Sequence, residues 1–144
     1  MFSDLCQNLQ KITQNYKRIM NMMLEPYGIT YPQYLVLANV FEKGEVLANE
    51  LINLLDSDKA TLSGIIKRLY ERDWILKGED PSDKRKQILT LSFEGRDKMH
   101  AIGSLEDECE KMLSHSFPLK DQHRLQQYLK ELIQNQDQYL KKAR

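Results

Sequence analysis

Hydrophobic side chains at both ends of the chain recur at helical spacing. Near the N-terminus they alternate steps of four and three residues through Leu5, Leu9, Ile12, Tyr16, Ile19 and Met23. Two later stripes follow similar steps through Met99, Ile102, Leu105, Cys109 and Met112, and through Leu125, Leu129, Leu132, Ile133 and Leu140. Such narrow stripes predict amphipathic helices. Each seam is buried either against other helices of the same chain or against a partner chain.

The segment that starts at residue 30 carries the signals of a helix N-terminus. Thr30 can cap the helix, and Gln33 at the third helical position can bond back to the cap. Pro32 lies in the first turn, where its missing N–H costs nothing. We therefore expect a helix that begins here and stops near Gly44.

Two shorter helices are expected next, separated by a tight turn. The first covers about residues 48–55, and its inward side chains are expected to be Leu51, Leu54 and Leu55. Residues 56–58, Asp-Ser-Asp, form a turn and cap cluster. The buried side of the second helix is then marked by Leu62, Ile65, Ile66 and Leu69. This arrangement is a helix-turn-helix.

The pattern after Asp73 changes to short extended runs. Residues 74–77 and 87–91 flank the polar segment 78–85, which predicts a two-stranded hairpin with a long polar tip. Ser92 can cap the next helix, and Pro118 separates the last two helices. The expected fold is mainly α with a small β-wing, in the order helix, helix, helix-turn-helix, wing, helix, helix.

The outer side of the second short helix suits insertion into the major groove of DNA. It presents Lys59, Thr61, Ser63, Gly64 and Lys67. The hydroxyls can donate to phosphates or base edges, the lysines can contact phosphates, and the glycine leaves room for close approach. A solvated helix face has a similar composition, so this helix alone does not decide between the two interpretations.

The hairpin tip favours the nucleic-acid interpretation. Lys84, Arg85 and Lys86 form a concentrated basic run, and Asp83 is placed to hold the Arg85 guanidinium through a paired contact. A basic tip of this kind can reach the minor groove. The alternative is a charged solvated turn, but the position of the tip directly after a helix-turn-helix makes that alternative the weaker one.

Composition bounds these expectations. The 144 residues fit one domain whose core needs no metal or disulfide, and 21 basic residues balance 21 acidic ones. Zero net charge permits a DNA partner only if the basic face is local. Two cysteines, no secretory signal and no apolar run of about 20 residues favour a cytoplasmic protein with reduced thiols and no membrane association.

Little in the sequence favours an enzyme. The three histidines show no metal-ligand spacing, and we find neither a glycine-rich phosphate loop nor a nucleophile elbow. We therefore expect no cofactor and no metal. A helical adaptor that binds protein would explain the hydrophobic seams, but it would leave the basic tip without a purpose.

At this point the sequence resembles the MarR family of winged helix-turn-helix transcriptional regulators. The resemblance is carried by the stretches 58–63, 68–69 and 74–75, by the Asp-Pro-Ser-Asp-Lys-Arg run at 80–85, and by 89–92 with Gly95. One departure is Asp73, where the family commonly has glycine.

The resemblance implies one domain over residues 1–144 and a homodimer with a two-fold axis. Residues 1–28 and 94–144 would dimerise, and residues 30–93 would form the DNA-binding lobe. It also implies a palindromic DNA operator and repression that a signal relieves. In this interpretation Arg85 enters the minor groove and Asp83 supports it.

Two kinds of signal stay open. The N-terminus is similar to the thiol-based, organic-hydroperoxide branch of the family, through Leu5-Cys6 and the Thr-Tyr-Pro-Gln-Tyr run at 30–34, which implies oxidation of Cys6 near Tyr31. Gln10 and Met20 depart from that branch. The rival is a small aromatic ligand in a cleft lined by Tyr16, Met20, Tyr27 and Tyr34. The same side chains can equally belong to the core.

Overall fold

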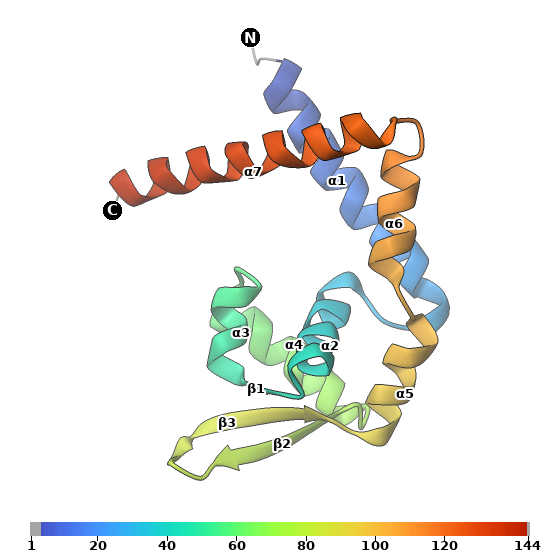
Figure 1. Ribbon diagram of the computed structural model, residues 1–144. Coiled ribbons are helices and arrows are strands. Elements are labelled where there is room, and N and C mark those ends of the chain that lie inside the picture. Colours follow the sequence, from blue (N-terminus) through green and yellow to red (C-terminus); the bar gives the residue numbers. More distant parts are fainter. Residues whose placement is uncertain (1–3, 144) are drawn as a thin grey trace. The chain divides into compact units, whose positions relative to one another are not determined.

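The computed structural model describes residues 4–143 and divides into two compact units, Met1–Gly103 and Ser104–Arg144. The first unit contains α1 (Asp4–Leu24), the 3-10 turn η1 (Glu25–Tyr27), α2 (Tyr31–Lys43), β1 (Glu45–Leu47), α3 (Ala48–Leu54), α4 (Lys59–Glu71), β2 (Ile75–Asp80), β3 (Asp83–Leu91) and α5 (Phe93–Ile102) (Figure 1). The second unit contains α6 (Leu105–Ser114) and α7 (Leu119–Lys142). None of the helices within residues 4–143 is both long and apolar enough to cross a membrane.

The corner between α1 and α2 forms as its sequence predicts. The Thr30 hydroxyl oxygen accepts from the Gln33 backbone N–H at 3.4 Å, and the Gln33 side-chain oxygen accepts from the Thr30 N–H at 3.1 Å. This reciprocal capping box confirms the expected start of α2. Two residues before Thr30, Gly28 closes η1 with a left-handed φ of 68°.

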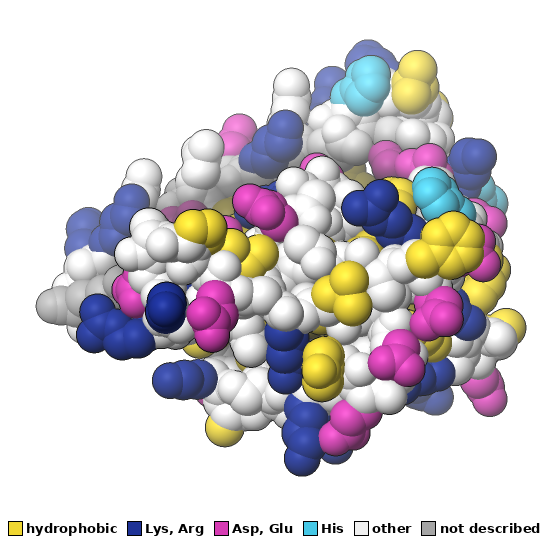
Figure 2. Space-filling model, turned by 90° about the horizontal axis from the view of Figure 1, so that it is seen from below, with side chains coloured by type: hydrophobic (Ala, Val, Ile, Leu, Met, Phe, Trp, Pro, Cys, Tyr) yellow, Lys and Arg dark blue, Asp and Glu magenta, His cyan; other side chains and the backbone are white. Residues whose placement is uncertain are grey.

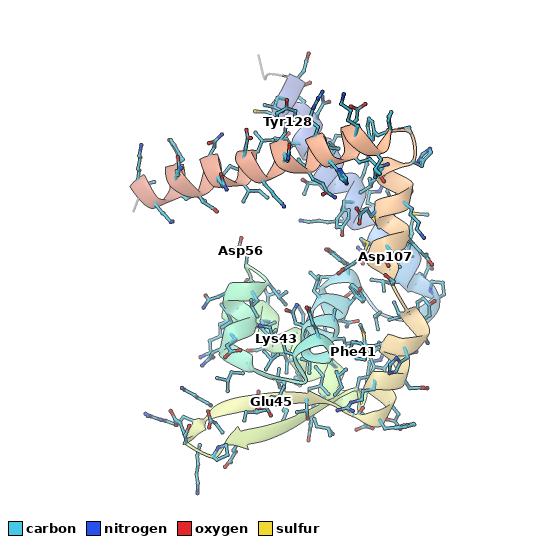
Figure 3. All side chains as sticks on the ribbon, in the orientation of Figure 1. Phe41, Lys43, Glu45, Asp56, Asp107 and Tyr128 are labelled. Atoms are coloured by element: carbon cyan, nitrogen blue, oxygen red, sulfur yellow. The ribbon has the colours of Figure 1, made fainter. Side chains whose placement is uncertain are left out.

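A helix-turn-helix of α3 and α4 packs on α2 and the sheet. Its buried apolar side chains, with those of α2, β1, β2 and β3, include Val36, Leu37, Val40, Val46, Leu51, Leu62, Leu69, Ile75 and Leu89. The expectation that Leu54 faces inward is wrong, because its side chain is 49% exposed. The helix α3 is only seven residues long, and its C-terminal end, next to Asp56, lies far from the sheet (Figure 3).

The wing is a three-stranded antiparallel sheet in the order β1-β3-β2. The short strand β1, which the sequence analysis did not predict, pairs Val46 with Leu89 of β3. The expectation of a long polar tip at residues 78–85 is also wrong, because β2 continues to Asp80 and β3 already starts at Asp83. The Asp80 carboxylate accepts from the Ser82 backbone N–H and hydroxyl and closes the short turn. Backbone pairing therefore extends beyond the apolar part of the hairpin.

The end of the wing is joined to α5 by a cap and a close contact. The Ser92 hydroxyl accepts from the Gly95 N–H at 3.0 Å and donates to the Asp73 carbonyl. Asp73 adopts a left-handed φ of 58°, the conformation that glycine normally supplies. A Cβ on Gly95 would lie 2.1 Å from the Trp74 carbonyl oxygen, so α5 begins in direct contact with the start of β2.

The sequence analysis expected the hydrophobic stripe from Met99 to Met112 to lie on one helix. In the structure it is divided between two helices. Gly103 has φ 65° and ψ −147°, which ends α5 at Ile102. A new helix, α6, starts at Leu105. Periodicity continues across the break because only Gly103 and Ser104 separate the two helices.

Candidate nucleic-acid interface

The N-terminus of α4 is fixed by Asp58. Its carboxylate accepts from the backbone N–H of Thr61 at 2.8 Å, which satisfies one of the otherwise unpaired donors of the first turn. The expected contact residues Lys59, Thr61, Ser63 and Lys67 are exposed. Lys67 lies 3.9 Å from Glu71 in an exposed pair that restrains it little.

Gly64 is half-buried, and a Cβ added there would meet no heavy atom within 4 Å. Nothing inside the protein therefore requires glycine at this position. A helical glycine costs about 1 kcal/mol relative to alanine. Close approach of another molecule to the helix would account for that cost.

The Thr61 hydroxyl is not available as the donor that the sequence analysis expected. It donates to the second Asp58 carboxylate oxygen at 2.7 Å. Thr61 therefore offers a nucleic acid only acceptor lone pairs and its methyl group. The hydrogen bonds from the Thr61 backbone and hydroxyl hold the pKa of the Asp58 carboxyl below its ordinary value of 3.8.

This cap predicts an acid-sensitive contribution to stability. Because the pKa of Asp58 is lowered in the folded state, its stabilisation is present above the ordinary pKa of 3.8 and is lost as the pH falls through the lower folded value. Thr61→Val removes the hydroxyl bond and should shift that loss to higher pH. Urea unfolding measured from pH 5 downward tests this, with Ser63→Ala as the control. Identical pH profiles for wild type and Thr61→Val would contradict it.

The wing holds its arginine in place while leaving it exposed. One Asp83 carboxylate oxygen accepts from the Arg85 backbone N–H at 3.0 Å and from its Nε at 3.2 Å. The Arg85 side chain is nevertheless 93% exposed, whereas that of Asp83 is 29% exposed. The two terminal nitrogens of the guanidinium therefore remain available on a restrained group. This contact is the one that the sequence analysis expected between the two residues.

The basic tripeptide at 84–86 lies on β3 rather than in a loop. Successive side chains of a strand point to opposite faces. Arg85 therefore lies on one face of the wing, and Lys84 and Lys86 lie on the other. On the face of the molecule shown in Figure 2, Lys and Arg side chains are interspersed with Asp and Glu side chains.

The residues proposed for sensing are only partly brought together. Tyr16 and Tyr31 meet edge to face with ring centroids 5.8 Å apart, and Tyr31 stacks on Tyr34 at 6.5 Å. Met20 is fully buried, so it belongs to the core rather than to the lining of a cleft. Cys6 is exposed and lies ten residues before Tyr16 on α1, roughly 15 Å away along the helix axis.

A cavity of about 300 Å³ lies between α1, the start of α2 and the turn between α3 and α4. It is lined by Lys17, Asn21, Tyr31, Pro32, Leu35, Leu55, Asp56, Ser57, Thr61, Leu62 and Ile65. Of the six proposed sensing residues, only Tyr31 lines it. The sequence analysis missed Leu55 and Ile65 because it assigned them to the core, whereas both are half-buried. An apolar side chain at helical spacing gives no signal that distinguishes these two positions.

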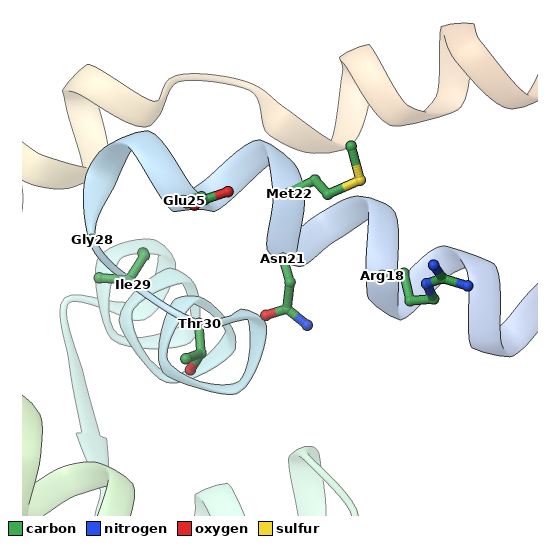
Figure 4. A pocket seen from close by; sticks show the side chains of 7 residues that line it. All are labelled: Arg18, Asn21, Met22, Glu25, Gly28, Ile29 and Thr30. Carbon is green, nitrogen blue, oxygen red and sulfur yellow. The ribbon is translucent and has the colours of Figure 1, made fainter.

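A second, more open hollow of about 580 Å³ lies at the corner between α1 and α2 (Figure 4). Its lining residues are Arg18, Asn21, Met22, Glu25, Gly28, Ile29 and Thr30. None of the six proposed sensing residues is among them. The buried thiol of Cys109 lines neither hollow, and burial raises its pKa.

This lobe is similar in sequence to transcriptional regulators. The MarR family model matches residues 29–86. The HTH-type transcriptional regulator MgrA of Staphylococcus aureus is 28% identical over 120 residues, which cover 82% of this chain and 79% of MgrA. The uncharacterized HTH-type transcriptional regulator YhbI of Bacillus subtilis is 28% identical over 96 residues, or 67% of this chain. That match spans 62% of the length of YhbI.

The fold is similar to that of solved DNA complexes. The structure of reduced AbfR bound to DNA matches with a TM-score of 0.71 and 26% identity, covering 94% of this chain and 91% of that one. MgrA and YhbI are both described as transcriptional regulators, in agreement with the sequence analysis, which found little that favours an enzyme.

Proposed function

We propose that this chain is a DNA-binding transcriptional regulator of the MarR family whose helix α4 and wing contact double-stranded DNA, because the MarR family model matches residues 29–86 and MgrA is similar over 120 residues. The observation that carries the proposal is the exposed guanidinium of Arg85, held by Asp83 at the tip of the wing. A restrained cation suits the narrow minor groove, because little side-chain freedom is lost on binding. On this proposal the regulator acts in the cytoplasm, where the DNA is.

A homodimer is part of this proposal. The helix α7 has no buried residue, and its hydrophobic stripe is exposed at Leu125, Leu129, Ile133 and Leu140. Leu5 and Ile12 of α1 are exposed as well. A second copy that covers these seams, through residues 1–28 and 94–144, would present two DNA-binding lobes of residues 30–93. A palindromic operator with half-sites about 34 Å apart would match that symmetry.

Gel shifts with the DNA upstream of the protein's own gene test the proposal. We expect a sequence-dependent shift, two chains in each complex, and an affinity that falls as salt rises from 50 to 200 mM, because bound phosphates release counterions. A helical adaptor would show neither sequence dependence nor salt dependence, and that result would contradict the proposal.

The substitution Gly64→Ala separates DNA approach from folding. The added methyl meets nothing inside the protein, so helix stability should rise by up to about 1 kcal/mol. Operator affinity should instead fall several-fold, because the methyl occupies the surface that faces the groove. Urea unfolding and gel shifts measure the two effects. Unchanged operator affinity in Gly64→Ala would contradict the close approach of DNA to this helix.

We further propose repression that is released by a small molecule. The cavity beside Tyr31 supports this, because it touches both α1 and the DNA-facing helix α4 through Thr61 and Ile65. A ligand that fits there in only one arrangement of these helices would shift the population of DNA-competent protein.

Oxidation of Cys6 is the alternative signal, and the exposure of its side chain supports it. If oxidation is the signal, hydroperoxide should release wild-type protein from its operator and leave the Cys6→Ser variant bound. Gel shifts along a hydroperoxide titration measure the difference. Equal sensitivity of the two proteins would remove Cys6 as the sensor and leave the cavity as the candidate.

A further inference from the structure

The residue that ends the DNA-facing helix contacts the corner that leads out of α1. Arg72 is the C-cap of α4, and its Nη1 donates to the Gly28 carbonyl at 2.6 Å, across 44 residues of sequence. Gly28 ends the turn η1, just before α2 begins (Figure 4). The side chain of Arg72 thereby connects the two elements.

The same guanidinium lies on an aromatic ring that is itself fixed. The Arg72 Cζ is 3.8 Å from the centroid of the Trp74 ring, and Trp74 is only 8% exposed. The Trp74 backbone donates to Leu69 in α4 and accepts from the Ser92 N–H, both at 3.1 Å. Lys98 of α5 places its Nζ 5.0 Å from the ring. The indole is therefore a rigid platform between α4, the wing and α5.

The contact requires the chemistry of arginine. A planar guanidinium can donate in its plane to a carbonyl while its face rests on an indole, whereas a compact ammonium cannot do both. The Arg72 guanidinium forms no ion pair with a carboxylate, since the only ion pairs within 4 Å among residues 4–143 are Lys67–Glu71 and Asp83–Arg85. The fit at the carbonyl is also close, because a Cβ on Gly28 would lie 3.3 Å from Arg72 Nη2.

We propose that Arg72 is a positioning residue that couples the corner at residues 25–30 to the orientation of α4. The inference rests on the proposed DNA-binding function. The corner continues directly from α1, which carries one of the proposed dimer seams, and α4 carries the proposed groove contacts. A change in the corner is transmitted through the Gly28–Arg72–Trp74 contact to the C-terminal end of α4. Arg72 thus controls operator affinity through the orientation of α4.

The test compares Arg72→Lys with Arg96→Lys, the same change at an exposed arginine of α5. Hydrogen exchange of the amides at 25–30 reports the corner. Acrylamide quenching reports Trp74, the single tryptophan of the chain. In Arg72→Lys we expect the amides at 25–30 to exchange several-fold faster and the Trp74 fluorescence to be quenched more strongly. We also expect this variant to bind the operator roughly tenfold more weakly. Arg96→Lys should match wild type in all three measurements.

A second variant, Arg72→Gln, loses both the charge over the indole and the reach of the guanidinium, and its amides at 25–30 should exchange at least as fast as those of Arg72→Lys. Unchanged exchange and quenching in Arg72→Lys would overturn the inference, whatever the DNA results are. A loosened corner with unchanged operator affinity would also overturn it, since the contact would then be structural only. If wild type binds no operator, the proposed function fails, and the exchange and quenching results alone decide the coupling.

Discussion

Arg85→Ala should weaken operator binding by about 1–3 kcal/mol, as expected for the loss of a well-placed groove contact. The guanidinium is exposed to 93% and touches Asp83 through Nε, so its removal leaves no cavity in the protein. The effect should therefore appear in affinity and not in the free energy of unfolding. Fluorescence anisotropy with labelled operator measures the first quantity, and urea titration measures the second.

Two further variants show which property of the wing matters. Asp83→Ala keeps the charge of Arg85 but releases its side chain, so affinity should fall by less than in Arg85→Ala. Lys84→Ala on the opposite face should weaken binding similarly for all sequences and reduce the salt dependence by about one counterion. If Arg85→Ala binds the operator as wild type does, Arg85 does not contact DNA. The exposed guanidinium held by Asp83 then no longer supports the proposed function.

Gly95→Ala should destabilise the fold by about 1–3 kcal/mol or more, the usual cost of forcing an extra methyl into a packed site. The new Cβ would lie 2.1 Å from the Trp74 carbonyl oxygen and 3.0 Å from the carbonyl carbon. These are backbone atoms, and the same oxygen already accepts from the Ser92 N–H. The start of α5 must therefore move away from the start of β2.

The midpoint of urea unfolding measures this loss, and Gly64→Ala is the matched control because its methyl meets nothing within 4 Å. The control should unfold at the same or a higher urea concentration. Equal midpoints for wild type and Gly95→Ala would show that α5 can move from the wing at little cost.

The sequence predicted well those contacts whose two partners are near each other along the chain. The capping box of Thr30 and Gln33 spans three residues, and the contact between Asp83 and Arg85 spans two. Local geometry nearly fixes such pairs once the helix or strand is assigned. The prediction of the buried side chains of α4 was also largely correct, because burial follows periodicity where a helix packs across its whole length.

Predictions failed where a backbone feature carried no hydrophobic signal. The strand β1 has three residues and is held by backbone pairing to β3. The short turn of the wing is closed by a polar carboxylate, Asp80, in a segment that looked like a long loop. At Gly103 a change of backbone direction divides a stripe whose spacing stays helical.

Apart from the strand β1 and the break between α5 and α6, the amino-acid sequence by itself determined the order of helices and strands. It also determined the caps of α2, α4 and α5 and the pairing of acid and base in the wing, because each depends on neighbours within a few residues. Only the tertiary structure decided that Arg72 lies on Trp74 and Gly28, that Met20 is core, and which side chains line the cavity near Tyr31. These features depend on how separate helices pack. Many packings satisfy the same pattern of apolar positions, and only the three-dimensional fit of the side chains selects one.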